Sequence, residues 1–229
     1  MYVLVLPCEK GEPVCADDHA NPAGGHFFFM YSTVFKRVKL SLPLTGFESA
    51  LLTEVNVAPA QLHPNSWAFV RAFNILCNHL DHTSSVDAFL YFFEAKNPGK
   101  RLWLSFNGVA GRVLLTLFQQ FYKGFKKKFF KVSCSVHDPT LLDGFPLYWV
   151  EKLGLKKLRS LEDLTPPDRE MCQLLSGLGA MFETAKLIKL KLCAKALKSY
   201  IGTILTFASP LLLIACLFSV LLFVVSMQT

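Results

Sequence analysis

The sequence predicts an α+β fold in which a helical N-terminal half packs with a small, mostly antiparallel sheet, followed by a C-terminal transmembrane helix. Three observations lead to this prediction. Apolar residues recur at helical spacing between residues 47 and 93, apolar and polar residues alternate in segments after residue 100, and no Asp, Glu, Lys or Arg follows Lys198. The 229 residues suffice for one domain of ordinary size with an appendage.

The composition excludes several classes of protein. Hydrophobic residues make up 52% of the chain and charged residues 18%, and the mean hydropathy is +0.36. The net charge of +7 comes from residues 95–137, which hold nine Lys or Arg and no acid. These values exclude a disordered, a collagenous or a uniformly basic histone-like chain. The seven cysteines are widely spaced without a C-x-x-C motif, which favours reduced thiols in an intracellular protein.

The first half predicts a leader, one extended segment and three helices. Residues 1–25 are interrupted by Pro and Gly and form a loose leader, and residues 26–44 are aromatic and β-branched, as in a strand. A short helix follows over residues 47–55, a long one begins at Pro64, and a third begins near Ser84. The long helix has an apolar stripe and a polar side, and its polar side consists of Arg71, Asn74 and Asn78.

The second half predicts the sheet and two more helical regions. A turn at residues 97–99 precedes a strand over 101–106, a helix over 113–121, a strand over 132–136 and another strand over 145–151. Thr165-Pro166-Pro167-Asp168 is a helix start, and a last basic helix covers about 180–199. The predicted domain therefore covers residues 26–185, with a basic juxtamembrane helix over 186–200.

Residues 201–227 predict the membrane anchor. They carry no charge and exceed the about 20 residues that a helix needs to cross a bilayer. The lysines before them place the N-terminal bulk in the cytosol, and they are Lys186, Lys189, Lys191, Lys195 and Lys198. The alternatives are a buried core helix and translated non-coding sequence. In the latter case a cytoplasmic or nuclear protein is expected.

No catalytic, cofactor or metal site is predicted. The acids show no recognisable three-carboxylate frame, and there is no P-loop, G-x-S-x-G or polymerase motif. Cys77, His79 and His82 could ligate zinc, but Cys77 lies on the apolar stripe, His79 lies off it, and no fourth ligand is near. His63 and His137 lie beside turn residues and are interpreted as surface histidines.

The basic, aromatic stretch YKGFKKKFFKV, residues 122–132, is the candidate binding site for RNA or DNA. Lysines neutralise phosphates and exposed rings stack on unpaired bases. The candidate residues are Lys100, Arg101, Arg112, Lys123, Lys126, Lys127, Lys128 and Lys131. Two alternatives stay open. The phenylalanines belong to the core beneath a solvated surface, or the lysines contact anionic lipid headgroups.

Four blocks carry a resemblance to a known family: NVAPAQLHPNSWAFVRAF (56–73), FLYFFEAKNPGKRLWLSFNGVAGRVLL, YKGFKKKFFKV and FPLYWVEK. In this order they resemble the plant gypsy-type transposon domain, from about residue 27 to residue 183. The family is named a transposase without an established catalytic centre, so the resemblance supplies no functional residues.

Three hypotheses follow from the resemblance. The leading one is a non-enzymatic, transposon-derived domain that binds nucleic acid and is attached to a membrane. The main alternative is a gag-like structural module that self-associates, or a degenerate fragment of an element. The third is an active metal-dependent transposase, which would need clustered carboxylates.

Overall fold

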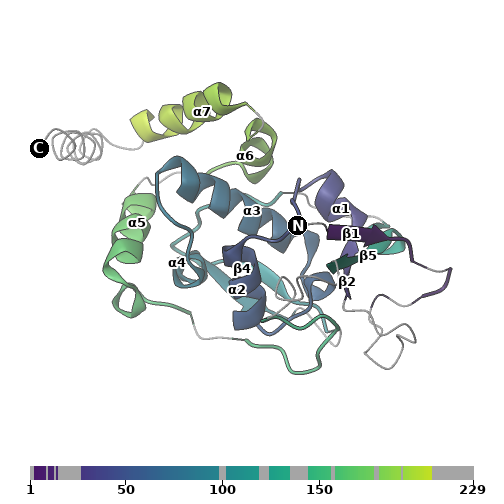
Figure 1. Cartoon of the computed structure of the whole chain (residues 1–229). Coiled ribbons are helices and arrows are strands. Elements are labelled where there is room, and N and C mark those ends of the chain that lie inside the picture. The colour runs from purple at the N-terminus through teal and green to yellow at the C-terminus, as the bar shows by residue number, and fades with distance from the viewer. Residues whose placement is uncertain are drawn as a thin grey trace, which may run out of the picture.

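The computed structural model describes residues 3–8, 10–12, 14, 27–97, 102–118, 124–134, 144–155, 158–177, 181–191 and 193–207. Helices occupy the centre, a three-stranded sheet lies at one end, and α5 (Pro166–Gly177) lies at the other (Figure 1). The core is continuous from the sheet through the central helices to the C-terminal helices. The predicted α+β class is confirmed.

Both sheets are antiparallel. In the first, β5 (Phe129–Cys134) lies between β1 (Val3–Leu6) and β2 (Phe27–Tyr31), and Val132 pairs with Val5 on one side and Phe28 on the other. The second sheet pairs β3 (Phe93–Lys96) with β4 (Ser105–Gly108). β1 is a difference from the sequence analysis, because four residues of the expected loose leader form an ordered edge strand.

The three helices predicted in the first half are present. They are α2 (Gly46–Glu54), α3 (Pro64–His79) and α4 (Val86–Phe92). α2 begins with a reciprocal capping box between Thr45 and Glu48, and α4 is capped by the Ser85 side chain. The extended segment expected over 26–44 is limited to β2. The N–H of Ser32 donates to the carbonyl of Lys128, and the chain then turns into α1 (Ser32–Lys36).

The polar side predicted for α3 is mostly buried. Arg71 and Asn74 are 5% and 8% exposed, and only Asn78 is on the surface as expected. Both buried residues have partners from other elements: Arg71 lies beside Glu48 of α2, and Asn74 accepts a hydrogen bond from the Ser84 hydroxyl at 2.9 Å. Because α6 (Thr184–Leu190) packs against α3, this central helix is covered on nearly every side.

Two elements predicted after residue 110 are not found where the structure describes their residues. The described residues of the 113–121 helix, 113–118, are not helical, since the N–H of Thr116 donates to Phe182 and the N–H of Phe182 donates to Leu114. Residues 145–151 form no strand, because the backbone of Val150 pairs with a side chain instead of a neighbouring strand. The strand expected over 101–106 begins at Ser105.

The C-terminal basic helix is two helices. α5 starts as predicted, with Thr165 and Asp168 hydrogen-bonded to each other, and the next predicted helix breaks into α6 and α7 (Ala194–Phe207).

Of the predicted transmembrane segment, residues 208–227 lie outside the described residues. The part that is described starts with Ile201, which is fully buried. None of the helices in the described part of the chain combines the length and apolar character that a bilayer crossing requires.

Candidate nucleic-acid interface

The block Asn56–Trp67 holds together segments that are distant in the sequence. Asn56 adopts a φ of 49° and its side-chain amide donates to the carbonyl of Lys152 at 2.9 Å. The Trp67 indole N–H donates to the carbonyl of Pro59, the first residue of η2 (Pro59–Gln61), at 3.1 Å. Ser66 accepts a hydrogen bond from the N–H of Phe106 in β4 at 2.8 Å. The block is therefore a structural connector.

Gln61 makes the largest share of these connections. Its side-chain oxygen accepts from the N–H groups of Ala58 at 3.0 Å and Val150 at 2.9 Å. Its side-chain amide donates to the carbonyls of Leu102 at 3.0 Å and Val150 at 2.8 Å. The residue is fully buried, and every one of these groups would cost free energy if left without a partner. The Gln61 amide thus supplies the hydrogen bonds that the backbone of Val150 would make with a neighbouring strand if residues 145–151 formed a strand.

An aromatic cluster lies beside this connector. Tyr31 stacks on Trp103 at 5.7 Å between ring centroids, and Trp103 meets Trp149 edge to face at 5.1 Å. Phe125 packs edgewise on Tyr31 at 5.1 Å and on Trp103 at 5.6 Å. Tyr31 and Trp103 are buried, so this cluster is a packed support for the residues that contact it from the solvent side.

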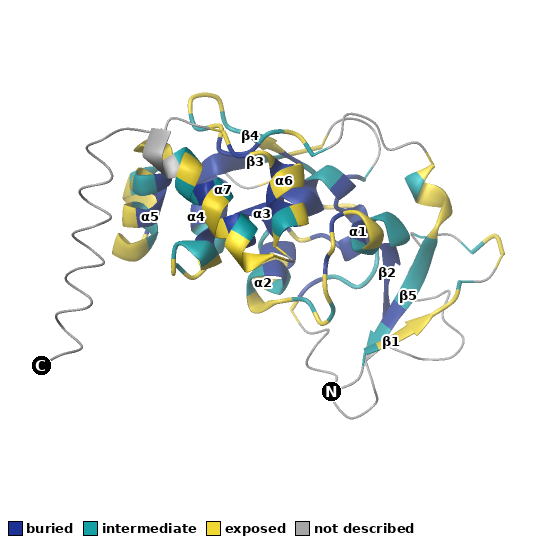
Figure 2. Cartoon of the chain, turned by 90° about the horizontal axis from the view of Figure 1, so that it is seen from above, coloured by how far each residue is buried: buried dark blue, intermediate teal, exposed yellow. Residues whose placement is uncertain are grey.

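The lysine turn, Lys126–Lys128, lies on this base. It spans the end of η3 (Phe125–Lys127), which follows Gly124 at a φ of 71°, a conformation that glycine adopts without strain. The Lys126 ammonium lies 4.6 Å from the centroid of the Trp103 ring, and all three lysines are exposed. The segment that leads into β5 is coloured as exposed in Figure 2. Among the described residues, Lys127 and Lys128 form no ion pair with a carboxylate. Lys127 and Lys128 therefore present positive charge to solvent that no carboxylate of the described residues compensates.

His63 connects the turn to α3. Its ring nitrogen Nδ1 accepts a hydrogen bond from the N–H of Asn65 at 3.2 Å and so caps the helix, while its ring lies 5.7 Å from Phe125. Burial lowers the pKa of His63, and the charge of Lys126 lowers this pKa further. The neutral ring is the form that can accept the capping bond. The expectation of a surface histidine was wrong, because the residue is half-buried.

The other candidate residues lie apart from the lysine turn or outside the described residues. Lys131 forms an ion pair with Glu12 and lies 5.0 Å from the centroid of the Phe27 ring, so its charge is partly compensated. Arg112 donates to the carbonyl of Arg159 at 2.8 Å and lies 4.3 Å from the centroid of the Tyr91 ring. Lys100, Arg101 and Lys123 lie outside the described residues.

The phenylalanines of the basic stretch point into the fold. Phe129 packs edgewise on Phe29 at 5.8 Å, and Phe130 lies 4.9 Å from Phe35 of α1. Together with Phe125 they pack against the core cluster and are half-buried. This arrangement matches the alternative in which the phenylalanines belong to the core. It leaves the lysines, and not the rings, as the exposed groups.

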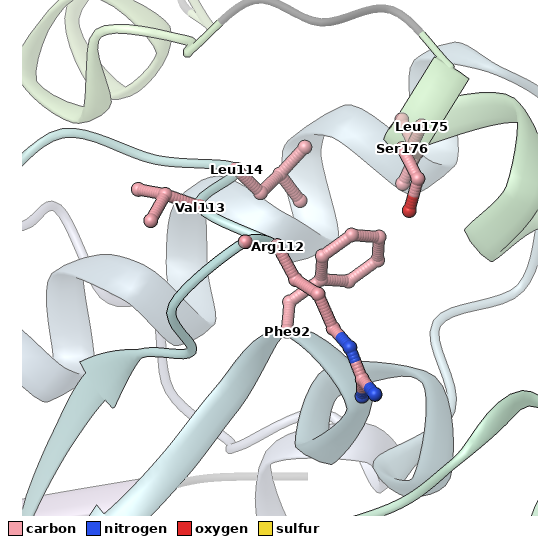
Figure 3. Close-up of a pocket in the computed structure, with 7 residues that line it drawn as sticks. Phe92, Arg112, Val113, Leu114, Leu175 and Ser176 are labelled. Atoms are coloured by element: carbon pink, nitrogen blue, oxygen red, sulfur yellow. The ribbon is translucent and has the colours of Figure 1, made fainter.

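A pocket of about 170 Å³ lies between the end of α4, the segment 111–114 and α5 (Figure 3). Phe92, Leu114 and Leu175 are among the residues that line it, and Ser176 adds one hydroxyl. The guanidinium of Arg112 points away from Leu114 and Ser176, towards its carbonyl partners. Arg112 therefore acts as a structural link between α4 and the segment around residue 159.

Two carboxylates converge in the described part of the chain, but they do so on a guanidinium. Arg159 donates to Asp87 at 2.7 Å and to Glu54 at 3.0 Å, which joins the N-terminus of α4 to the C-terminus of α2. The pKa of Arg159 is raised, chiefly by its hydrogen bond to Asp87. Within the same described residues, no group of three or more His, Cys, Asp or Glu is arranged to hold a metal ion.

Sequence reasoning missed His63 and Trp103 as neighbours of the lysines. His63 precedes the helix-starting Pro64, and this position is a signal for a capping role. Trp103 carries no such signal, because its place beneath Lys126 depends on how residues 102–106 pair with Gln61 and Ser66.

These features define an α+β domain whose strongest motif is a structural connector and whose nearby exposed charge is basic. Residues 29–97, from β2 to the residue after β3, match the family model described as "Putative gypsy type transposon". The resemblance noted in the sequence is therefore confirmed for residues 29–97, which are similar to this transposon-related family. No curated protein and no solved structure matches the chain.

Proposed function

We propose that this transposon-derived chain is non-catalytic and binds single-stranded nucleic acid through the lysine turn. The observation that carries the proposal is the set of three consecutive exposed lysines above a buried aromatic base, two of them without a carboxylate partner in the described region. Lysines in this arrangement neutralise backbone phosphates and release counterions.

The orientation of the phenylalanine rings in the basic stretch determines which kind of nucleic-acid binding we propose. Because Phe125, Phe129 and Phe130 pack against the core, stacking on bases contributes little. Contact to phosphates alone carries no information about sequence. The proposed binding is therefore insensitive to base sequence and strongly weakened by salt.

The test is the affinity of the full chain, kept in nonionic detergent, for a single-stranded RNA oligonucleotide over a series of salt concentrations. Changing Lys126, Lys127 and Lys128 together to Gln removes three phosphate contacts. For single strands the slope of log K against log salt should then become shallower by about 2. Fluorescence anisotropy of a labelled oligonucleotide measures both slopes.

The matched control removes the same charge elsewhere. Lys189, Lys195 and Lys198 of α6 and α7 are also exposed, and changing them to Gln should leave the slope as in the original chain. Equal losses in the two variants would mean that net charge, and not the lysine turn, governs binding. An unchanged slope in the Lys126–Lys128 variant would refute the proposal.

Self-association is the second candidate function, and β1 favours it. β1 is one of the two edge strands of its sheet, and its residues Leu4, Val5 and Leu6 are 47%, 57% and 42% exposed. Apolar edge strands without Lys or Pro pair readily with another strand. Sedimentation equilibrium on the same samples separates the two functions. A dimer that Val5→Lys dissociates, with no RNA binding, would favour the gag-like module.

Membrane attachment through the C-terminal segment is the remaining part of the proposal. The sequence after α7 is uncharged from residue 208 to residue 229. Since Ile201 is buried against the domain, the bilayer-crossing part would begin beyond α7. Residues 208–227 then match the about 20 residues that a helix needs to cross the hydrocarbon core.

A further inference from the structure

A second basic surface lies on α6 and α7, apart from the lysine turn. These helices cover the outer side of α3, whereas β5 and the turn before it belong to the sheet end of the molecule (Figures 1 and 2). The exposed lysines of this second surface are Lys186, Lys189, Lys191, Lys195 and Lys198. We call it the α6–α7 lysine face.

The α6–α7 lysine face has almost no compensating charge. Glu183 is the last acid of the chain, and it pairs with Lys186 at 3.7 Å. Lys189, Lys195 and Lys198 form no ion pair with any carboxylate in the described part of the chain. Lys195 and Lys198 are three residues apart on one helix, so their side chains lie on neighbouring positions of one side.

The helices that carry these lysines are fixed to the domain. Leu187 and Ile188 of α6 and Leu197 and Ile201 of α7 are buried in the core. The N–H of Glu183 donates to the Tyr200 hydroxyl at 2.9 Å, which joins the start of α6 to the middle of α7. The lysines therefore stand on a packed helical pair, and not on a linker of free orientation.

We infer that the α6–α7 lysine face binds the surface of an anionic lipid bilayer and so holds the domain against the membrane in one orientation. Two features favour a bilayer as the partner. The face carries five exposed lysines against the one carboxylate of Glu183, which complements anionic headgroups, and α7 leads directly into the uncharged residues 208–229. The inference rests on the proposed membrane attachment and adds which surface of the domain meets the lipid.

The test uses the full chain, synthesised in the presence of preformed vesicles. Its lysines are then acetylated, and mass spectrometry measures the rate of acetylation of each lysine. One set of vesicles is neutral phosphatidylcholine, and the other contains about 30 mol % phosphatidylserine. On the anionic vesicles, Lys189, Lys195 and Lys198 should each react about fivefold more slowly than on the neutral ones, which corresponds to ~1 kcal/mol for a lysine at such a surface. The protection should disappear at high salt.

Lys127 and Lys128 are the internal reference, because they lie on the other basic surface and should react equally on both kinds of vesicle. A chain that enters both vesicles while Lys189, Lys195 and Lys198 stay equally reactive overturns the inference but leaves the attachment standing. A chain that enters neither overturns both. If the anionic vesicles protect Lys127 and Lys128 instead, the lysine turn is the surface that meets the lipid. If RNA protects the lysines of α6 and α7 without vesicles, the α6–α7 lysine face is the surface that binds nucleic acid. Either result would overturn the inference.

Discussion

At the scale of single residues, Gln61 explains more of the fold than any charged group does. A glutamine amide carries two donors and an acceptor oxygen, and here all of them are used inside the core. The block in which the resemblance is most specific therefore fixes the backbone around it, and its polar residues serve the fold. The sequence alone does not reveal the role of Gln61, because this role depends on its partners Leu102 and Val150.

Replacing Gln61 with Met should therefore destabilise the protein severely. The volume is similar, but two N–H groups and two carbonyls around the buried side chain lose their partner, so we expect a loss of about 3–5 kcal/mol in the free energy of unfolding. Urea unfolding followed by tryptophan fluorescence measures it. Gln173→Met on the exposed surface of α5 is the control and should change stability by less than about 0.5 kcal/mol. Similar effects in both variants would contradict the role of Gln61.

At the scale of elements, α2 and α3 meet through a buried ion pair. Glu48 and Arg71 are 1% and 5% exposed, and the Nη1 atom of Arg71 lies 3.9 Å from Oε1 of Glu48. Glu48 also accepts a hydrogen bond from the N–H of Thr45 at 2.8 Å. Burial raises the pKa of Glu48, and the hydrogen bonds of Thr45 and the charge of Arg71 oppose this rise.

Removing one partner should cost more than removing both charges. Arg71→Met leaves a buried carboxylate unpaired and should lower stability by about 3–5 kcal/mol. Glu48→Gln combined with Arg71→Met keeps an acceptor for Thr45 and removes both charges, so we expect the double variant to be more stable than Arg71→Met alone. Denaturant unfolding of the single and double variants measures this coupling. Losses of stability in the two single variants that simply add in the double variant would refute it.

The pH dependence of the Arg71→Met variant provides a second readout. Without Arg71 the folded-state pKa of Glu48 lies above the value of the unfolded chain, so the folded state takes up a proton first as the pH falls. The stability deficit should therefore narrow as the pH is lowered from neutral towards that raised pKa. A deficit that stays constant over this range would mean that Glu48 does not titrate in the fold.

Local sequence predicted those elements whose signals are local. The apolar spacing of α2, the start of α5 at Thr165–Asp168, Pro64 at the start of α3 and the alternation of β5 were all readable from neighbouring residues. The failures at 113–118 and 145–151 share one cause, because their backbone partners, Phe182 and Gln61, are far away in the sequence. The burial of Arg71 was missed for the same reason, since its neighbours come from α2 and α6.

At the scale of the whole molecule, the positive charge divides between two surfaces. One is the lysine turn above the aromatic cluster, and the other is the α6–α7 lysine face beside the start of the uncharged segment. The sequence predicted both sets of lysines, but only the fold shows that Lys131 and Arg112 are engaged by other groups. The candidate site was thus predictable in its lysines and not in its support by Trp103 and His63.

The most direct test of the central proposal is the pKa of His63 with and without a single-stranded oligonucleotide, followed by NMR and assigned with the His63→Asn variant. The charge of Lys126 contributes to lowering this pKa, so a phosphate bound at the lysine turn should raise it. We expect a rise on binding in the original chain and a smaller rise in Lys126→Gln. Binding of the oligonucleotide with no change in the pKa of His63 would contradict the account.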